Sequence, residues 1–282
     1  MDERARPRLC VLSSGSSGNC AIVRSASATI LIDAGLAPRR TRTLLERVGV
    51  GLDEIDAVIL THLDGDHWHP GWATGWPRFM REDCTLHLHR AHLRRAERAG
   101  TLFTRPTPFE DDLDLPGAVH VACRLLAHDD EGVASFRFTL PGADLGWATD
   151  AGRVTPALID HLEGVDVLAI ESNYCPRMQT RSGRPAFLIQ RVMGGAGHLS
   201  NHECLQAVDA IAPREHVVLL HLSRDCNHPD LVADLHAGAD YALTIAARYE
   251  PTRWINIGAA RPRPSIRAAQ SPAASSRPGA AP

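Results

Sequence analysis

Short apolar runs alternate with polar turns at the start of the chain. Three such runs, LCVL, CAIV and TILID, lie between Arg8 and about Asp33, and the segments SSGSSGN and RSASA separate them. Runs of β-favouring residues that are bounded by Gly and Ser clusters are typical of strands. The pattern therefore predicts successive antiparallel strands at this end of the molecule.

A segment with helical spacing of its apolar residues comes next along the chain. The segment PRRTRTLLERVG carries leucines and a valine at helical intervals and ends at Gly49, while AVIL, Ala57 to Leu60, has the continuous apolar character of a buried strand. In the middle of the chain we predict a helix around His89 to Ala99, followed by strands at VHVACRLL, VASFRFTL and LGWAT.

Strands and helices alternate in the second half. VDVLAI and HVVLLHL predict buried strands, and PAFLIQRVM and HECLQAVDAI predict helices. Strands first, then strands alternating with helices, indicate a layered α/β protein. The last segment is rich in Ala, Pro, Ser and Arg without apolar periodicity, so burial cannot offset its ordering entropy. We expect one domain over residues 1–258 and a disordered tail over 259–282.

Composition narrows the classes of protein. A chain of 282 residues with 44% hydrophobic content can bury a sizeable core, and a formal net charge of -3 excludes a broadly basic surface for nucleic acid. The charged start MDERARPR lacks a secretory signal, and no apolar run is long enough to span a bilayer. The seven cysteines are scattered without a C-x-x-C pair. We expect a cytoplasmic protein with reduced cysteines and no membrane contact.

Polar side chains concentrate in THLDGDHWHP, Thr61 to Pro70, directly after the AVIL strand. Because side chains alternate along an extended chain, His62 and Asp64 point the same way, while Asp66 and His67 reach a neighbouring point. Imidazole and carboxylate together suit Zn, Mn or Fe. The loop therefore predicts ligands for two metal ions, with a solvated polar turn as the alternative.

The chain resembles the metallo-β-lactamase-fold hydrolases, whose H-x-H-x-D-H motif follows a buried strand. Within them it is most similar to the YycJ (WalJ) branch of nuclease-like proteins. Between Leu9 and Asn227 it contains, in that branch's order, LSSGSSGNC, LIDAGL, THLDGDH, AHDD, ATDAG, ESN, GHLSN and HLSRDCN. The resemblance implies an α/β fold, a four-layer αβ/βα sandwich, with a dinuclear metal centre at one edge of the sheets.

The resemblance also implies seven metal ligands. They are His62, Asp64 and His128 for one ion, Asp66, His67 and His221 for the other, and Asp150 as the bridge. His128, Asp150 and His221 follow the apolar runs RLLA, GWAT and VVLL, so each is expected at a strand end, where layered α/β proteins place their chemistry. Asp33 in LIDAG is expected to support a ligating histidine.

Asp64 stands where the family has a histidine. The extra anion lowers the charge of two metals, three aspartates and a bridging hydroxide from about plus one to about zero. Such a centre should bind an anionic substrate less strongly and should favour Mn²⁺ more. Two alternatives stay open: His69 supplies the imidazole instead, or the site has lost one metal.

A dinuclear centre can hydrolyse a phosphodiester with a metal-bridging hydroxide. We assign catalysis to Asp66, Asp150 and His198. Phosphate is favoured by an arginine-rich segment and by GHLSN, whose His198 and Asn201 can donate hydrogen bonds. The arginines are Arg177, Arg181, Arg184 and Arg191. We assign substrate binding to Arg184, His198 and Asn201, against the alternative that the arginines form a solvated helix face.

Resemblance to the YycJ branch implies a phosphodiesterase that acts on DNA or RNA, in the manner of a 5′-exonuclease, with two divalent metal ions, Zn or Mn. A phosphodiesterase for small molecules is the second hypothesis. A metal-binding regulatory or partner-binding protein, in which Asp64 has removed catalysis, is the third. The oligomeric state does not follow from the sequence.

Overall fold

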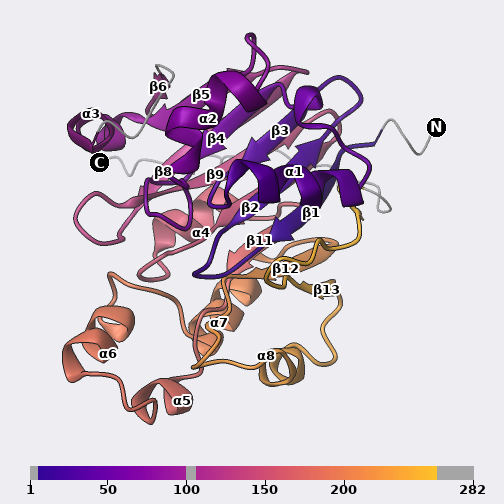
Figure 1. Cartoon of the computed structure of the whole chain (residues 1–282). Coiled ribbons are helices and arrows are strands. Elements are labelled where there is room, and N and C mark those ends of the chain that lie inside the picture. The colour runs from indigo at the N-terminus through magenta and orange to yellow at the C-terminus, as the bar shows by residue number, and fades with distance from the viewer. Residues whose placement is uncertain (1–5, 100–105, 259–282) are drawn as a thin grey trace, which may run out of the picture.

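Two seven-stranded β-sheets pack face to face at the centre of the computed structural model, which describes residues 6–99 and 106–258. Helices pack on the outer face of each sheet, so the layers follow the order αβ/βα (Figure 1). This arrangement confirms the predicted four-layer α/β sandwich.

The first sheet has the strand order β14-β1-β2-β3-β4-β5-β6. Its strands are β1 (Arg8–Ser13), β2 (Cys20–Arg24), β3 (Thr29–Ile32), β4 (Ala57–Leu60), β5 (Thr85–His89), β6 (Thr107–Phe109) and β14 (Ile255–Asn256). As predicted, β1, β2 and β3 are antiparallel neighbours, whereas β3, β4, β5 and β6 run parallel. The loops after β3 and β4 therefore emerge at the same edge.

The second sheet has the order β13-β12-β11-β10-β9-β8-β7. Its strands are β7 (Asp112–Leu115), β8 (Val119–Leu126), β9 (Val133–Leu140), β10 (Ala143–Ala148), β11 (Val167–Glu171), β12 (His216–Leu220) and β13 (Ala242–Ile245). Strands β10 to β13 are parallel, and β8 runs in the same direction because both β8 and β10 are antiparallel to β9. The carboxyl ends of β8, β10 and β12 thus lie at one edge.

The helices lie between the strands along the chain. They are α1 (Pro38–Arg47), η2 (Leu52–Glu54), α2 (Gly71–Phe79), η3 (Arg90–His92), α3 (Leu93–Ala99), α4 (Pro156–Leu162), α5 (Pro176–Thr180), α6 (Ala186–Met193), α7 (Asn201–Ile211) and α8 (Pro229–Leu235). α1, α6 and α7 confirm three predicted helices. The helix predicted around His89 to Ala99 is also confirmed, with its helical segment beginning at Arg90, directly after β5 ends at His89.

Alternation along the strands explains why their sequences are almost continuously apolar. In β1, Leu9 and Val11 face the core between the sheets, while Cys10 and Leu12 pack under the helices on the outer face. Successive side chains of a strand point to opposite faces, and here both faces are buried. The same pattern in β4 leads a buried strand directly into the loop that begins at Thr61.

The predicted tail, 259–282, lies outside the described residues. None of the helices within the described ranges is both long enough and apolar enough to cross a bilayer. All seven cysteines are free and six of them are buried, in keeping with the expectation of reduced core residues.

Candidate metal centre

Asp33 fixes the start of the loop that follows β4. Its carboxylate accepts a hydrogen bond from the backbone N–H of Thr61 at 2.8 Å, and it lies 2.7 Å from Nδ1 of His67. Asp33 is fully buried and adopts a left-handed φ of 58°. A carboxylate on Nδ1 leaves Nε2 of the histidine free to bind a metal. This is the supporting role that the sequence predicts for Asp33.

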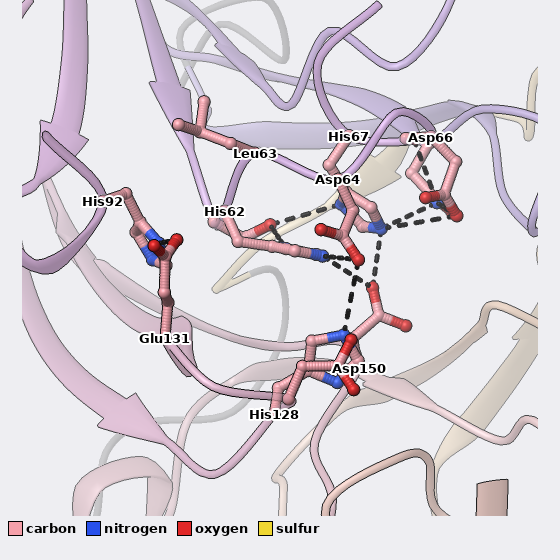
Figure 2. Close-up of polar contacts among 12 residues, drawn as sticks. His62, Leu63, Asp64, Asp66, His67, His92, His128, Glu131 and Asp150 are labelled. Carbon is pink, nitrogen blue, oxygen red and sulfur yellow. Dashed lines mark hydrogen bonds and ion pairs between the residues drawn. The ribbon is translucent and has the colours of Figure 1, made fainter. Parts of the chain in front are cut away.

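The structure brings all seven predicted metal ligands together. They occur in groups whose ligand atoms lie within 4.8 Å of one another: His62, Asp64 and His128; Asp66, His67 and His221; and His62, His67 and Asp150. In the first group, Oδ2 of Asp64 lies 3.8 Å from Nε2 of His62 and 3.8 Å from Nε2 of His128 (Figure 2). Ligands from two sheets thus converge on one point.

The second group lies beside the first, with Asp150 between them. Oδ2 of Asp66 is 3.3 Å from Nε2 of His221. Oδ2 of Asp150 is 2.6 Å from Nε2 of His67 and 3.7 Å from Nε2 of His62 (Figure 2). One carboxylate therefore contacts histidines of both groups, which is the position of a bridging ligand.

Unsatisfied polar atoms at the centre fit a divalent cation. Both carboxylate oxygens of Asp150 and both ring nitrogens of His221 are buried and have no hydrogen-bond partner of good geometry among the described residues, although they lie close to one another and to other charged groups. Buried polar atoms without hydrogen bonds are rare in native proteins. Imidazole nitrogen and carboxylate oxygen are ligands for Zn and Mn, so this donor set suits a divalent metal.

The charges of the cluster favour its ionised forms. Burial alone raises the pKa of Asp150, but His221 and His67 outweigh burial and hold that pKa well below its ordinary value. Burial likewise lowers the pKa of His221, yet Asp150 and Asp66 raise it to about 9. Without a metal, protons on the histidines balance the carboxylates, and a cation that binds here replaces them.

Asp64 points into the cluster, and His69 does not. Nδ1 of His69 accepts a hydrogen bond from the backbone N–H of Gly71 at 2.9 Å, at the start of α2. Oδ1 of Asp64 accepts a hydrogen bond from Nη2 of Arg95 at 2.8 Å, which leaves Oδ2 toward His62 and His128. The geometry favours Asp64 over His69 as the third ligand of its group.

Helix α3 also contacts the loop that carries His128. Oε2 of Glu131 lies 3.6 Å from Nδ1 of His92 and 3.8 Å from Nη1 of Arg95, and Arg98 lies 3.9 Å from the same carboxylate (Figure 2 draws the His92 contact). The positive charges of Arg95 and Arg98 are thus balanced by the negative charges of Asp64 and Glu131. Arg95 was not identified from the sequence.

His198 lies beside the cluster and is held by two carboxylates. Its Nδ1 is 2.8 Å from Oε1 of Glu171 and 3.1 Å from Oδ1 of Asp150. Burial lowers the pKa of His198, but Glu171 and Asp150 raise it well above its ordinary value. Glu171 ends β11 and is fully buried, and sequence reasoning missed its role. The available signal was its position in ESN, at the end of an apolar run.

Two predicted substrate residues lie away from the cavity at the metal centre. This cavity, of about 170 Å³, is lined by all the predicted ligands except His67, together with His198 and Arg191. Arg184 and Asn201 both belong to the described residues, and neither lines this cavity. Arg184 pairs with Asp225 at 3.0 Å. Asn201 is buried, and hydrogen bonds with Ser172 and Asn227 engage its amide. Their placement therefore does not favour direct substrate contact, whereas Arg191 is exposed at the rim.

Comparison with known proteins agrees with the fold and the side-chain cluster described above. A family model described as a β-lactamase superfamily domain matches residues 28–222. The exodeoxyribonuclease WalJ of Streptococcus pneumoniae serotype 2 is 25% identical over 251 residues, covering 83% of this chain and 91% of that protein. The exodeoxyribonuclease YycJ of Bacillus anthracis is 24% identical over 229 residues, covering 78% and 84%.

Solved structures share the fold. A diphosphatase of the PhnP family superposes with a TM-score of 0.65 at 18% identity, covering 89% of this chain and 98% of that protein. At this identity the similarity concerns the arrangement of strands and helices.

Proposed function

The chain belongs to the β-lactamase superfamily and is a metal-dependent hydrolase, and on this premise we propose that it is an exonuclease that cleaves the phosphodiester bonds of DNA. The convergence of histidine and carboxylate side chains from both sheets at the candidate metal centre carries the proposal. The names of the two exodeoxyribonucleases, each similar over more than three quarters of this chain, support DNA as the substrate.

We assign two divalent ions to the centre. His62, Asp64 and His128 would hold one, Asp66, His67 and His221 the other, and Asp150 would contact both. When bound, such ions polarise the phosphodiester and lower the pKa of a coordinated water. Three carboxylates among the ligands favour Mn²⁺ more than an all-imidazole site does, and Zn²⁺ is the competing ion.

His198 is assigned as the proton donor and phosphate contact. Glu171 and Asp150 hold its Nδ1 and keep the ring protonated, which leaves the rest of the ring to the cavity. A protonated imidazole can hydrogen-bond a phosphate oxygen and can donate a proton to the leaving oxygen of the cleaved bond. Asp66 and Asp150 are assigned to catalysis through their position at the centre.

Incubation of the purified protein with Mn²⁺ or Zn²⁺ and single- or double-stranded DNA or RNA tests the proposal. Release of nucleotides is expected, and Asp150→Ala should abolish it. Asp160→Ala, an exposed carboxylate on α4, is the matched control and should retain the parent rate. Circular dichroism checks that Asp150→Ala folds. Absence of release with either metal and every nucleic acid would contradict the proposal.

The shape of the site favours a polymer over a small phosphodiester. A further cavity of about 380 Å³ shares His62, Asp64, His128 and Arg191 with the metal cavity, so the two adjoin. Hydrolysis of bis-p-nitrophenyl phosphate without any release from DNA or RNA would instead support the small-molecule hypothesis. Bound metal without hydrolysis of either would support the regulatory hypothesis. The cytoplasmic location expected from the sequence stays a prediction.

A further inference from the structure

A second cavity site, larger than the two adjoining cavities at the metal centre, lies beside that centre. Its volume is about 600 Å³, within the size range of small-molecule sites. Three segments form its walls: the loop after β1, the loop after β12 and the chain that follows β13. The lining residues that matter here are Ser14, Leu222, Arg224, Ile245, Arg248 and Tyr249. None of these residues has a part in the proposed reaction.

The two cavities share a wall. Ser14 lines the second cavity, and Ser16, two residues later, lines the metal cavity. Oγ of Ser14 accepts a hydrogen bond from the backbone N–H of the metal ligand His221 at 2.8 Å. Two residues of extended chain span at most about 7 Å, and a nucleic-acid strand carries a phosphate every 3.4 Å or so of helix axis. A nucleotide one or two positions along the strand can therefore reach across this wall.

Two arginines give the second cavity a positive charge. Neither Arg224 nor Arg248 forms an ion pair or a hydrogen bond with any residue that the structure describes. Arg248 is half-buried, and its guanidinium lies over the loop, since a Cβ on Gly15 would stand 3.8 Å from its Nε and Nη2. A guanidinium without a carboxylate partner is available to a phosphate, whose geometry it matches. This contrasts with Arg184 and Arg191, which already pair with aspartates.

The rest of the lining is apolar and aromatic. Leu222, Ile245 and Ala246 supply apolar surface, and Tyr249 supplies a ring. The guanidinium of Arg40 lies 4.4 Å from the centroid of that ring, and the Tyr249 hydroxyl donates to the carbonyl of Ser17 at 3.4 Å, so the ring is held in place. Sites for single-stranded nucleic acid combine positive groups for the backbone with aromatic and apolar surface for the bases.

We propose that this second cavity binds a nucleotide of the substrate strand adjacent to the scissile bond, with its phosphate at Arg248 and Arg224 and its base against Tyr249, Leu222 and Ile245. The inference rests on the proposed nuclease function for its substrate. It assigns the chain that follows β13 to substrate recognition, a segment without any metal ligand. The strand then runs from the metal centre over the Ser14 to Ser16 loop.

Binding of a phosphorothioate DNA oligonucleotide to the full-length, metal-loaded protein tests the proposal. Fluorescence anisotropy should show that Arg248→Gln raises Kd about 10-fold, since a charge-assisted hydrogen bond contributes on that order. Arg224→Gln, at an exposed position, should have a smaller effect in the same direction. Each variant should also make the slope of the log of the binding constant against the log of the salt concentration less steep, by the amount that corresponds to about one phosphate contact. Arg78→Gln, an exposed arginine on α2, is the matched control. An unchanged Kd and salt slope in Arg248→Gln overturns the proposal.

A second measurement separates this site from the metal centre. Hydrolysis of bis-p-nitrophenyl phosphate requires the metal centre alone, so Arg248→Gln and Arg224→Gln should retain the parent's rate and metal content. If the parent neither cleaves nor binds DNA, the proposed function fails. Calorimetry with a deoxynucleoside monophosphate then tests separately whether the second cavity binds a nucleotide. Binding that Arg248→Gln weakens supports a nucleotide site. Binding that is absent, or equal in parent and variant, overturns it.

Discussion

By the family resemblance, Asp64 stands in place of a histidine, and in the structure Arg95 contacts it. An aspartate in place of an imidazole adds a negative charge beside the metals. Nη2 of Arg95 lies 2.8 Å from the outer oxygen of Asp64, so a guanidinium offsets that charge without covering the oxygen that faces His62 and His128. The pair restores the positive balance that an anionic substrate needs.

Arg95→Gln should therefore weaken the binding of DNA more than it disturbs the metals. The pair is partly exposed, and exposed ion pairs contribute about 0.2–1 kcal/mol, so KM should rise by up to about 5-fold with metal content unchanged. Steady-state kinetics together with metal analysis measure both. Arg94→Gln, the exposed neighbour on α3, should behave as the parent. An unchanged KM would show that Arg95 does not offset the charge of Asp64.

Asp64→His should shift the metal preference toward zinc. Imidazole favours Zn²⁺ over Mn²⁺ more strongly than carboxylate does, and the side chain at position 64 already faces His62 and His128. After dialysis against equal Zn²⁺ and Mn²⁺, the variant should retain as many ions as the parent with a higher ratio of zinc to manganese. An unaltered ratio would indicate that residue 64 does not bind a metal.

Single residues differ in how far sequence predicts them. His128, Asp150 and His221 were expected as ligands from the family resemblance, in keeping with their position after apolar runs, and the structure brings them together. Arg95 and Glu171 were not predicted as site residues. Arg95 meets Asp64 only through the placement of α3, on which many arginines look alike in sequence. Asn201 has the composition of a donor, but burial against Ser172 and Asn227 engages its amide.

Among secondary-structure elements, β5 and α2 were not predicted. β5 has the sequence TLHLH, in which Leu86 and Leu88 pack under the helices while His87 and His89 occupy the opposite face, and buried histidines obscure its apolar character. α2 contains two glycines and Pro77, which disfavour a helix, yet burial of Trp72 and Trp76 stabilises it. In both, tertiary packing overrides local preference.

His87 should make β5 sensitive to acid. Burial lowers the pKa of His87 from 6.5 to about 4. Because the folded-state pKa lies below the unfolded value, the unfolded chain binds the proton first, and stability is lost as pH falls from about 6.5 to about 4. His87→Gln, which can still bond the Thr85 hydroxyl, should lose less stability over that interval in urea titrations. His202→Gln, exposed on α7, is the control. If the free energy of unfolding falls equally with pH in the parent and in both variants, His87 is not the source of the acid sensitivity.

The metal centre joins the two halves of the molecule. His62, Asp64, Asp66 and His67 follow β4 of the first sheet, whereas His128, Asp150 and His221 follow β8, β10 and β12 of the second. The core between the sheets holds them together by burial, but their edges meet at the site through these side chains. A divalent cation bound by ligands of both sheets would therefore act as a cross-link between them, in addition to any catalytic role.

Removal of metal should consequently lower the thermal stability of the whole fold. A ligand that binds only the native state stabilises it by about 2.7 kcal/mol at 100 times its Kd, and in a domain of this size each kcal/mol shifts Tm by about 2–4 °C. Calorimetry before and after chelation should show a loss of roughly 5–10 °C, restored by added Zn²⁺ or Mn²⁺. Asp150→Ala, which lacks the residue shared by both groups, should respond much less to chelation, while Asp160→Ala should match the parent. If metal analysis confirms removal and Tm does not move, the ions do not connect the two sheets, and the centre is confined to catalysis.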